Sequence, residues 1–85
     1  MRTYESANMF IKGHMRTGFL SRRARGFFIR NWVEAMNSGM TYKEARKTAL
    51  DNTKYELGNP MMWLAISWAI ENLLIPLLKR WWENR

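Results

Sequence analysis

The sequence predicts an all-α fold with two shorter helices, at about residues 21–37 and 41–57, and one long apolar helix at about 60–82. Apolar residues recur with a helical period in each of these stretches, and residues typical of helix starts and ends flank them. No stretch alternates apolar and polar residues as a strand does. The chain of 85 residues is long enough for one small domain, which buries little core by itself.

The first twenty residues give the weakest signal for structure. Ala7, Phe10, Ile11 and His14 can share one face of a short helix that ends at Gly13. A packed or solvent-exposed role fits His14, the sole histidine, better than a catalytic one.

Ser21 can cap the helix at 21–37, and Gly39 is placed to end it. The apolar stripe of this helix comprises Ala24, Phe28, Trp32, Ala35 and Met36, widened by Ile29 and Val33.

Thr41 and Glu44 form a capping box that starts the helix at 41–57, and Gly58 ends it. This second helix is polar with a narrow side of small apolar residues, so we expect it on the surface, facing water or a partner.

The long helix starts with Asn59 as N-cap and Pro60 at the first helical position. Trp63 and Trp81 are 18 residues apart, about 27 Å along a helix, close to the ~30 Å hydrocarbon core of a bilayer. Tryptophan favours both interfaces of a membrane. Pro76 removes one backbone hydrogen bond and should bend the helix there.

Glu71 lies near the middle of this apolar stretch and weakens the transmembrane interpretation. Eight Leu and Ile residues contribute roughly −4 kcal/mol to insertion, whereas one central carboxylate costs roughly +3 kcal/mol. We therefore expect Glu71 to meet a Lys or Arg of a neighbouring subunit. The alternative is the core helix of a soluble helical assembly. The residues predicted to contact membrane or partner are Trp63, Ile66, Ile70, Glu71, Leu73, Leu77, Trp81 and Trp82, with Ile66, Ile70, Leu73 and Leu77 facing lipid or a hydrophobic groove.

The formal net charge is +7, and six basic residues lie between positions 12 and 30 without an acid. This asymmetry favours a polyanion, either nucleic acid or anionic lipid. A solvated cationic face is the alternative. The predicted polyanion-binding residues are Lys12, Arg16, Arg22, Arg23, Arg25 and Arg30.

The sequence offers no catalytic constellation, because it has no Cys, a single His and no phosphate-binding Gly-rich loop. We expect no enzyme activity, cofactor or metal. Ala35, Gly39 and Ala45 have the spacing of a helix-turn-helix motif, but Glu34 and Thr48 stand where apolar residues are required.

The chain divides into a basic helical region, 1–58, and an apolar Trp-bounded helix, 59–85. The last helix is apolar on too much of its circumference for the two shorter helices, with their limited apolar area, to cover. We therefore expect no self-sufficient bundle. This plan is similar in outline to small structural proteins of membrane-containing virions and to accessory subunits of membrane complexes, although no residue motif carries the likeness.

We therefore predict a non-enzymatic structural component of a larger assembly: a small membrane-associated virion or phage protein, without a secretory signal, whose basic region contacts nucleic acid or anionic lipid. Its partners would be other subunits or copies of itself, with membrane lipid. The alternatives are an accessory subunit of a membrane complex and a soluble basic nucleic-acid-binding module.

Overall fold

A computed structural model describes residues 2–14, 22–57 and 60–84. The elements in chain order are α1 (Tyr4–His14), α2 (Arg22–Asn37), α3 (Tyr42–Leu57), α4 (Pro60–Ala69), the π-helical segment η2 (Ile70–Leu74) and α5 (Ile75–Glu83). No strand occurs in the described ranges, so the all-α prediction is confirmed. The short N-terminal helix also exists and ends one residue beyond the expected Gly13.

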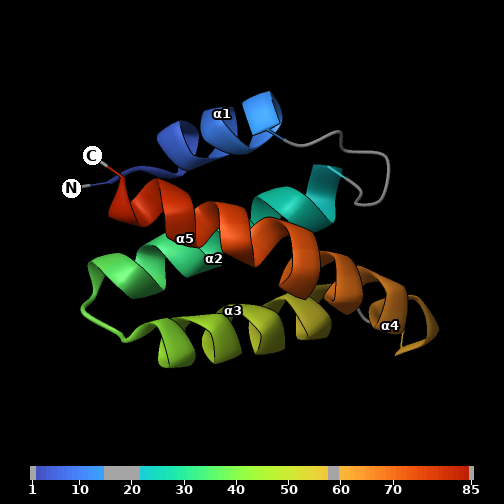
Figure 1. Cartoon of the computed structure of the whole chain (residues 1–85). Helices are drawn as coiled ribbons and strands as arrows, with labels where there is room; N and C mark the ends of the chain where they lie inside the picture. Colours follow the sequence, from blue (N-terminus) through green and yellow to red (C-terminus); the bar gives the residue numbers. More distant parts are fainter. Residues whose placement is uncertain (1, 15–21, 58–59, 85) are drawn as a thin grey trace.

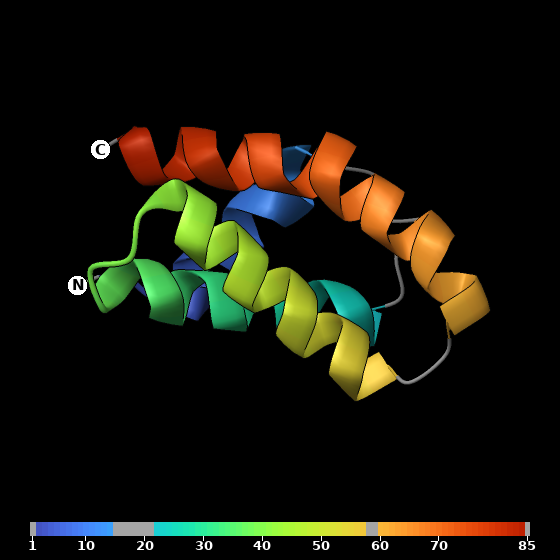
Figure 2. The ribbon, with the colours of Figure 1, turned by 90° about the horizontal axis from the view of Figure 1, so that it is seen from below.

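Helix α2 packs against α3 and α1, the two helices that flank it in the sequence. Helix α3 lies along one side of α2, while α1 packs against both α2 and α5 (Figure 1). Helix α4 extends from the end of the molecule where α3 finishes, and its contacts with other helices are mainly to α3. The last helix therefore lies partly against the rest of the protein and partly beyond it (Figures 1 and 2).

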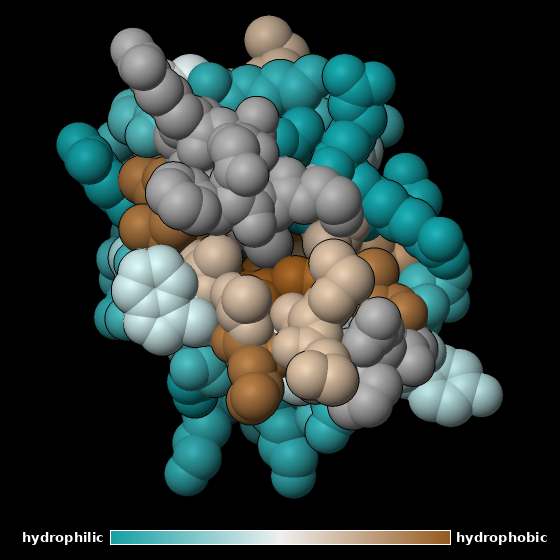
Figure 3. Space-filling view, turned by 90° about the vertical axis from the view of Figure 1, so that its right-hand side faces the viewer, coloured by the Kyte–Doolittle hydropathy of each residue, from teal (hydrophilic) through white to brown (hydrophobic). Residues whose placement is uncertain are grey.

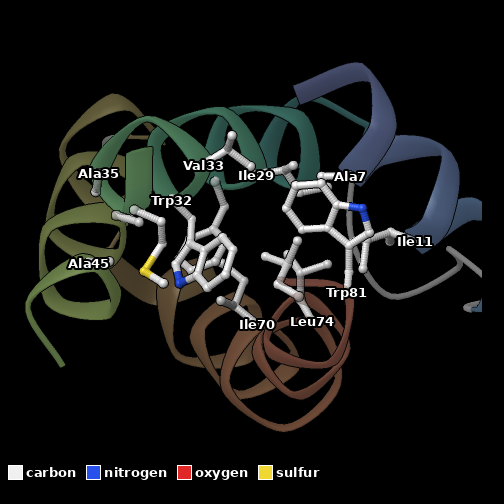
Figure 4. Close-up of a cluster of buried hydrophobic side chains, with 14 of the residues drawn as sticks. Ala7, Ile11, Ile29, Trp32, Val33, Ala35, Ala45, Ile70, Leu74 and Trp81 are labelled. Atoms are coloured by element: carbon white, nitrogen blue, oxygen red, sulfur yellow. The ribbon is translucent and has the colours of Figure 1, made fainter. Parts of the chain in front are cut away.

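The core lies between α1, α2 and the second half of the last helix. Figure 4 shows Ile29 and Trp32 of α2 facing Ile70, Leu74 and Trp81. Ile70 and Leu74 are completely buried, and Trp81 is nearly so. Burying one such side chain contributes roughly 1.5–3 kcal/mol, so this contact is a major part of the stability of so small a domain. The remaining buried apolar residues are Ala7, Ile11, Ala24, Phe28, Val33, Ala35, Met36, Ala45, Ala49, Ala69 and Leu78.

The corner between α2 and α3 forms as the sequence predicts. Gly39 adopts a φ of 98°, a left-handed conformation that glycine tolerates best. The capping box is complete: Thr41 N–H donates to Glu44 Oε1 at 3.1 Å, and Glu44 N–H donates to Thr41 Oγ1 at 3.2 Å. The second predicted corner, at residues 58 and 59, lies outside the described residues, as does the predicted Ser21 cap.

The last helix contains a π-helical turn just before Pro76. The N–H of Ile75 donates to the carbonyl of Ile70, five residues earlier, instead of four. Pro76 has no N–H to give, and its ring would clash with the carbonyl four residues before it in a regular α-helix. The wider turn accommodates the proline, and the helix axis changes direction between α4 and α5 (Figure 2). The expected disturbance therefore appears on the N-terminal side of the proline.

Candidate functional site

The two halves of the last helix differ sharply in what surrounds them. Segments η2 and α5 contribute four buried apolar side chains to the core, whereas Ala69 is the one residue of 61–69 that is buried. Four large apolar side chains of α4 are instead exposed to solvent: Met61 85%, Leu64 75%, Met62 59% and Trp68 59%. Because α4 is apolar on every side, it presents an apolar surface wherever no helix covers it.

This exposed apolar surface of α4 is contiguous. Figure 3 views the end of the molecule that carries α4 and shows apolar side chains gathered at its centre, with hydrophilic side chains around them. Soluble monomers rarely expose large contiguous apolar patches, and such patches mark contacts with proteins, ligands or membranes. We call the set Met61, Met62, Leu64, Ala65 and Trp68 the α4 surface.

Two residues predicted to face a membrane or partner lie in the core of the chain itself. Ile70 is completely buried and Trp81 is 9% exposed, because the η2–α5 segment uses this face to pack on α1 and α2. Trp81 also donates from its indole N–H to Ser6 Oγ at 3.4 Å. This corrects the expectation that Ile70 faces lipid or a partner's groove. The other predicted apolar residues are half-buried: Trp63, Ile66, Leu73, Leu77 and Trp82.

Glu71 forms an ion pair with a basic residue of the same chain. Arg46 Nη2 of α3 lies 3.1 Å from Glu71 Oε1, and each side chain is a little under half exposed. The prediction required a Lys or Arg from a neighbouring subunit. The structure supplies Arg46, near the start of α3, as the cation that pairs with Glu71 of η2.

The six predicted polyanion-binding residues do not share one environment. Lys12, Arg22, Arg23 and Arg30 are exposed, and Arg16 lies outside the described residues. Arg23 pairs with Glu56 at 3.1 Å, and the Arg30 guanidinium lies 4.8 Å from the centre of the Tyr4 ring. That these exposed cations bind a polyanion stays a prediction.

Arg25 was predicted to lie on a polyanion-binding surface, but the structure buries it. It is only 5% exposed, and its Nε–H is buried without a hydrogen-bond acceptor. Its position follows from helical spacing, because Arg25 precedes Phe28 and Ile29 by three and four residues and shares their inward face. A surface phosphate therefore has little access to this guanidinium.

Three exposed basic residues, two of them among the six predicted, lie at the end of the molecule that carries α4. Arg22 and Arg23 lie in the first turn of α2, and Lys54 lies in the last turn of α3. The Arg23–Glu56 ion pair ties these two helix ends together, and α4 contacts α3 directly. The end of the molecule that carries the α4 surface thus also carries exposed positive charge.

A cluster of aromatic and cationic side chains at the opposite end was not predicted. Trp32 contacts Trp82 edge-on at 5.8 Å between ring centres, and it stacks on Tyr42 at 6.3 Å. Arg2 covers Trp82 at 4.0 Å, and Lys79 covers Tyr42 at 5.2 Å. Burial, together with the nearby Glu83 carboxylate, raises the pKa of the Tyr42 hydroxyl. These contacts join residues far apart in the sequence and fasten the end of α5 to the bundle.

Residues Met61–Glu83 form a helical segment long and apolar enough to cross a membrane, with a mean hydropathy of 1.6 in its most apolar window. A core helix of a soluble protein can have the same length and composition. The chain matches no protein-family model, curated protein or solved structure. Within the described residues, no group of His, Cys, Asp or Glu is arranged to hold a metal ion.

Proposed function

We propose that the chain is a non-enzymatic structural component of a larger assembly and that α4 holds it on a membrane. The observation that carries this proposal is the exposure of Met61, Met62, Leu64, Ala65 and Trp68 along α4 in an otherwise folded helical domain. Covering these side chains with lipid would remove their apolar area from water, which is favourable at roughly 25 cal/mol per Å². A virion or phage setting stays a prediction that the α4 surface neither requires nor opposes.

Flotation of the purified chain with lipid vesicles tests this proposal. We expect the chain to float with vesicles that contain one-third phosphatidylserine. The single variants Leu64→Glu and Trp68→Glu should each abolish flotation, because each places a carboxylate on the α4 surface. Met9→Glu is the matched control, because Met9 is 74% exposed and Leu64 is 75% exposed, but Met9 lies on α1. A parent chain that stays with the soluble fraction would refute the membrane role.

A further inference from the structure

We infer that α4 lies in the plane of an anionic bilayer and inserts only its outer apolar surface, while η2 and α5 remain in the helical core. This inference rests on the proposed membrane role and specifies its mode and its lipid. The chain would then enter the membrane from one side only, as a monotopic protein does, although residues 61–83 have the length and composition of a membrane-spanning helix.

The packing of η2 and α5 opposes a transmembrane position for the last helix. Ile70, Leu74 and Leu78 are completely buried against the rest of the chain, at four-residue spacing along one face. A membrane-spanning helix would have to remove these three side chains from the core. It would also have to remove Trp81 and break the hydrogen bond from Trp81 to Ser6. Helix α1 packs on both α2 and α5, so this withdrawal would dismantle the domain. Insertion of α4 alone disturbs none of these contacts.

The dimensions of α4 suit an interfacial helix. Its ten residues span about 15 Å, half of the ~30 Å hydrocarbon core. Trp63 and Trp68 supply the amphipathic rings that favour the headgroup level of a membrane. The π-helical turn of η2 changes the direction of the helix where the exposed half meets the buried half. Helix α4 can therefore lie against a surface that α5 does not enter.

The charges beside α4 specify an anionic surface. Arg22, Arg23 and Lys54 are exposed at the same end of the molecule, and Glu56 offsets one of these charges through its ion pair with Arg23. Interfacial helices gain affinity for membranes from buried apolar area together with attraction to anionic lipids. Nucleic acid would use the cations but would leave the aliphatic side chains of the α4 surface in water, so lipid fits both features of this end.

The first test measures how binding depends on lipid charge. The parent should bind vesicles with one-third phosphatidylserine at least tenfold more tightly than neutral phosphatidylcholine vesicles. The triple variant Arg22→Gln, Arg23→Gln, Lys54→Gln should bind the anionic vesicles about 100-fold more weakly, at roughly fivefold per cation.

A control triple variant, Lys43→Gln, Lys47→Gln, Arg80→Gln, changes the net charge equally at other exposed positions. It should bind anionic vesicles within about threefold of the parent. Equal losses in the two triple variants would overturn the assignment of a specific basic rim beside α4.

The second test measures depth in the membrane, and the absence of Cys from the sequence makes single-cysteine labelling clean. Spin labels at Leu64→Cys and Asn72→Cys should respond oppositely on anionic vesicles. The label at 64 should become accessible to oxygen and shielded from a water-soluble nickel chelate, whereas the label at 72 should stay accessible to the chelate.

The two labels separate the inference from the proposed function. If the chain floats with vesicles but the label at 72 is shielded at the bilayer centre, the helix spans and only this inference fails. If vesicles do not bind at all, the membrane role fails first. Tighter binding to single-stranded RNA than to anionic vesicles, lost in the first triple variant, would also overturn the inference and assign the basic end to nucleic acid.

Discussion

Replacing Leu74 by Ala measures how firmly the second half of the last helix belongs to the core. The Leu74 side chain is completely buried and lies among Ile29, Ile70 and Trp81. Removing a buried leucine side chain costs about 2–5 kcal/mol, as lost transfer energy plus the cavity left behind. A domain of this size has a total stability of about 4–13 kcal/mol, so the variant should lose a large fraction of it.

Urea unfolding followed by circular dichroism checks this expectation. With a slope of about 1–2 kcal/mol per molar urea, a loss of ~3 kcal/mol lowers the midpoint by about 1.5–3 M. Leu64→Ala is the matched control, because it makes the same change at a side chain that is 75% exposed. It should alter stability by less than about 0.5 kcal/mol. Equal midpoints for the two variants would refute the division of the last helix into a buried half and an exposed half.

Three further predictions concern the bundle itself. Arg25→Met should leave the free energy of unfolding unchanged or raise it, because it replaces a buried, incompletely bonded guanidinium with an apolar side chain; a loss above 1 kcal/mol in urea would contradict this. Gly39→Ala should cost about 1–2 kcal/mol, because an L side chain is strained at a φ of 98°, and an unchanged midpoint would count against that corner. The backbone and side-chain hydrogen bonds from Thr41 lower the pKa of Glu44, so this contribution to stability is present above the ordinary value of 4.5 and is lost as the pH falls through the folded-state pKa. Thr41→Ala should cost about 1 kcal/mol near neutral pH, because it removes the hydroxyl that caps α3. It should undo only the side-chain part of the lowering of the Glu44 pKa, since the backbone N–H of residue 41 remains; an unchanged urea midpoint would disprove the capping role.

Local signals in the sequence were sufficient for the helices and for the cap of α3. Thr41 and Glu44 cap α3 through short-range hydrogen bonds, and Gly39 forms the corner by its own backbone freedom. Pro76 predicts a disturbance by its missing N–H. Each of these features depends on residues within one or two turns, which a sequence displays directly.

Tertiary partners could not be read from the sequence in the same way. Helical period placed Ile70 and Leu73 on an apolar face, but it did not say that the core of the same chain would bury Ile70. The pairing of Glu71 with Arg46 depends on the angle between α3 and the last helix, which no local pattern encodes. The burial of Arg25 could have been suspected, because its position falls on the inward stripe of α2.

The division of the sequence into a basic region, 1–58, and an apolar helix, 59–85, stays a prediction about domains. Within the described residues, the contacts cross this boundary, since α5 packs on α1 and the aromatic cluster joins Trp82 to Trp32. The change in environment along the last helix falls at η2 instead, between the exposed α4 and the buried face of η2 and α5.

Hydrogen–deuterium exchange of the full chain, with and without anionic vesicles, tests most directly whether the bundle docks intact through α4. We expect vesicles to slow amide exchange in α4 at least tenfold and to leave α1, α2 and α5 within twofold of their rates in solution. Faster exchange throughout α1 and α2 on vesicles, with protection extending from residue 61 to residue 83, would show that the last helix leaves the core to span the bilayer and would contradict docking through α4.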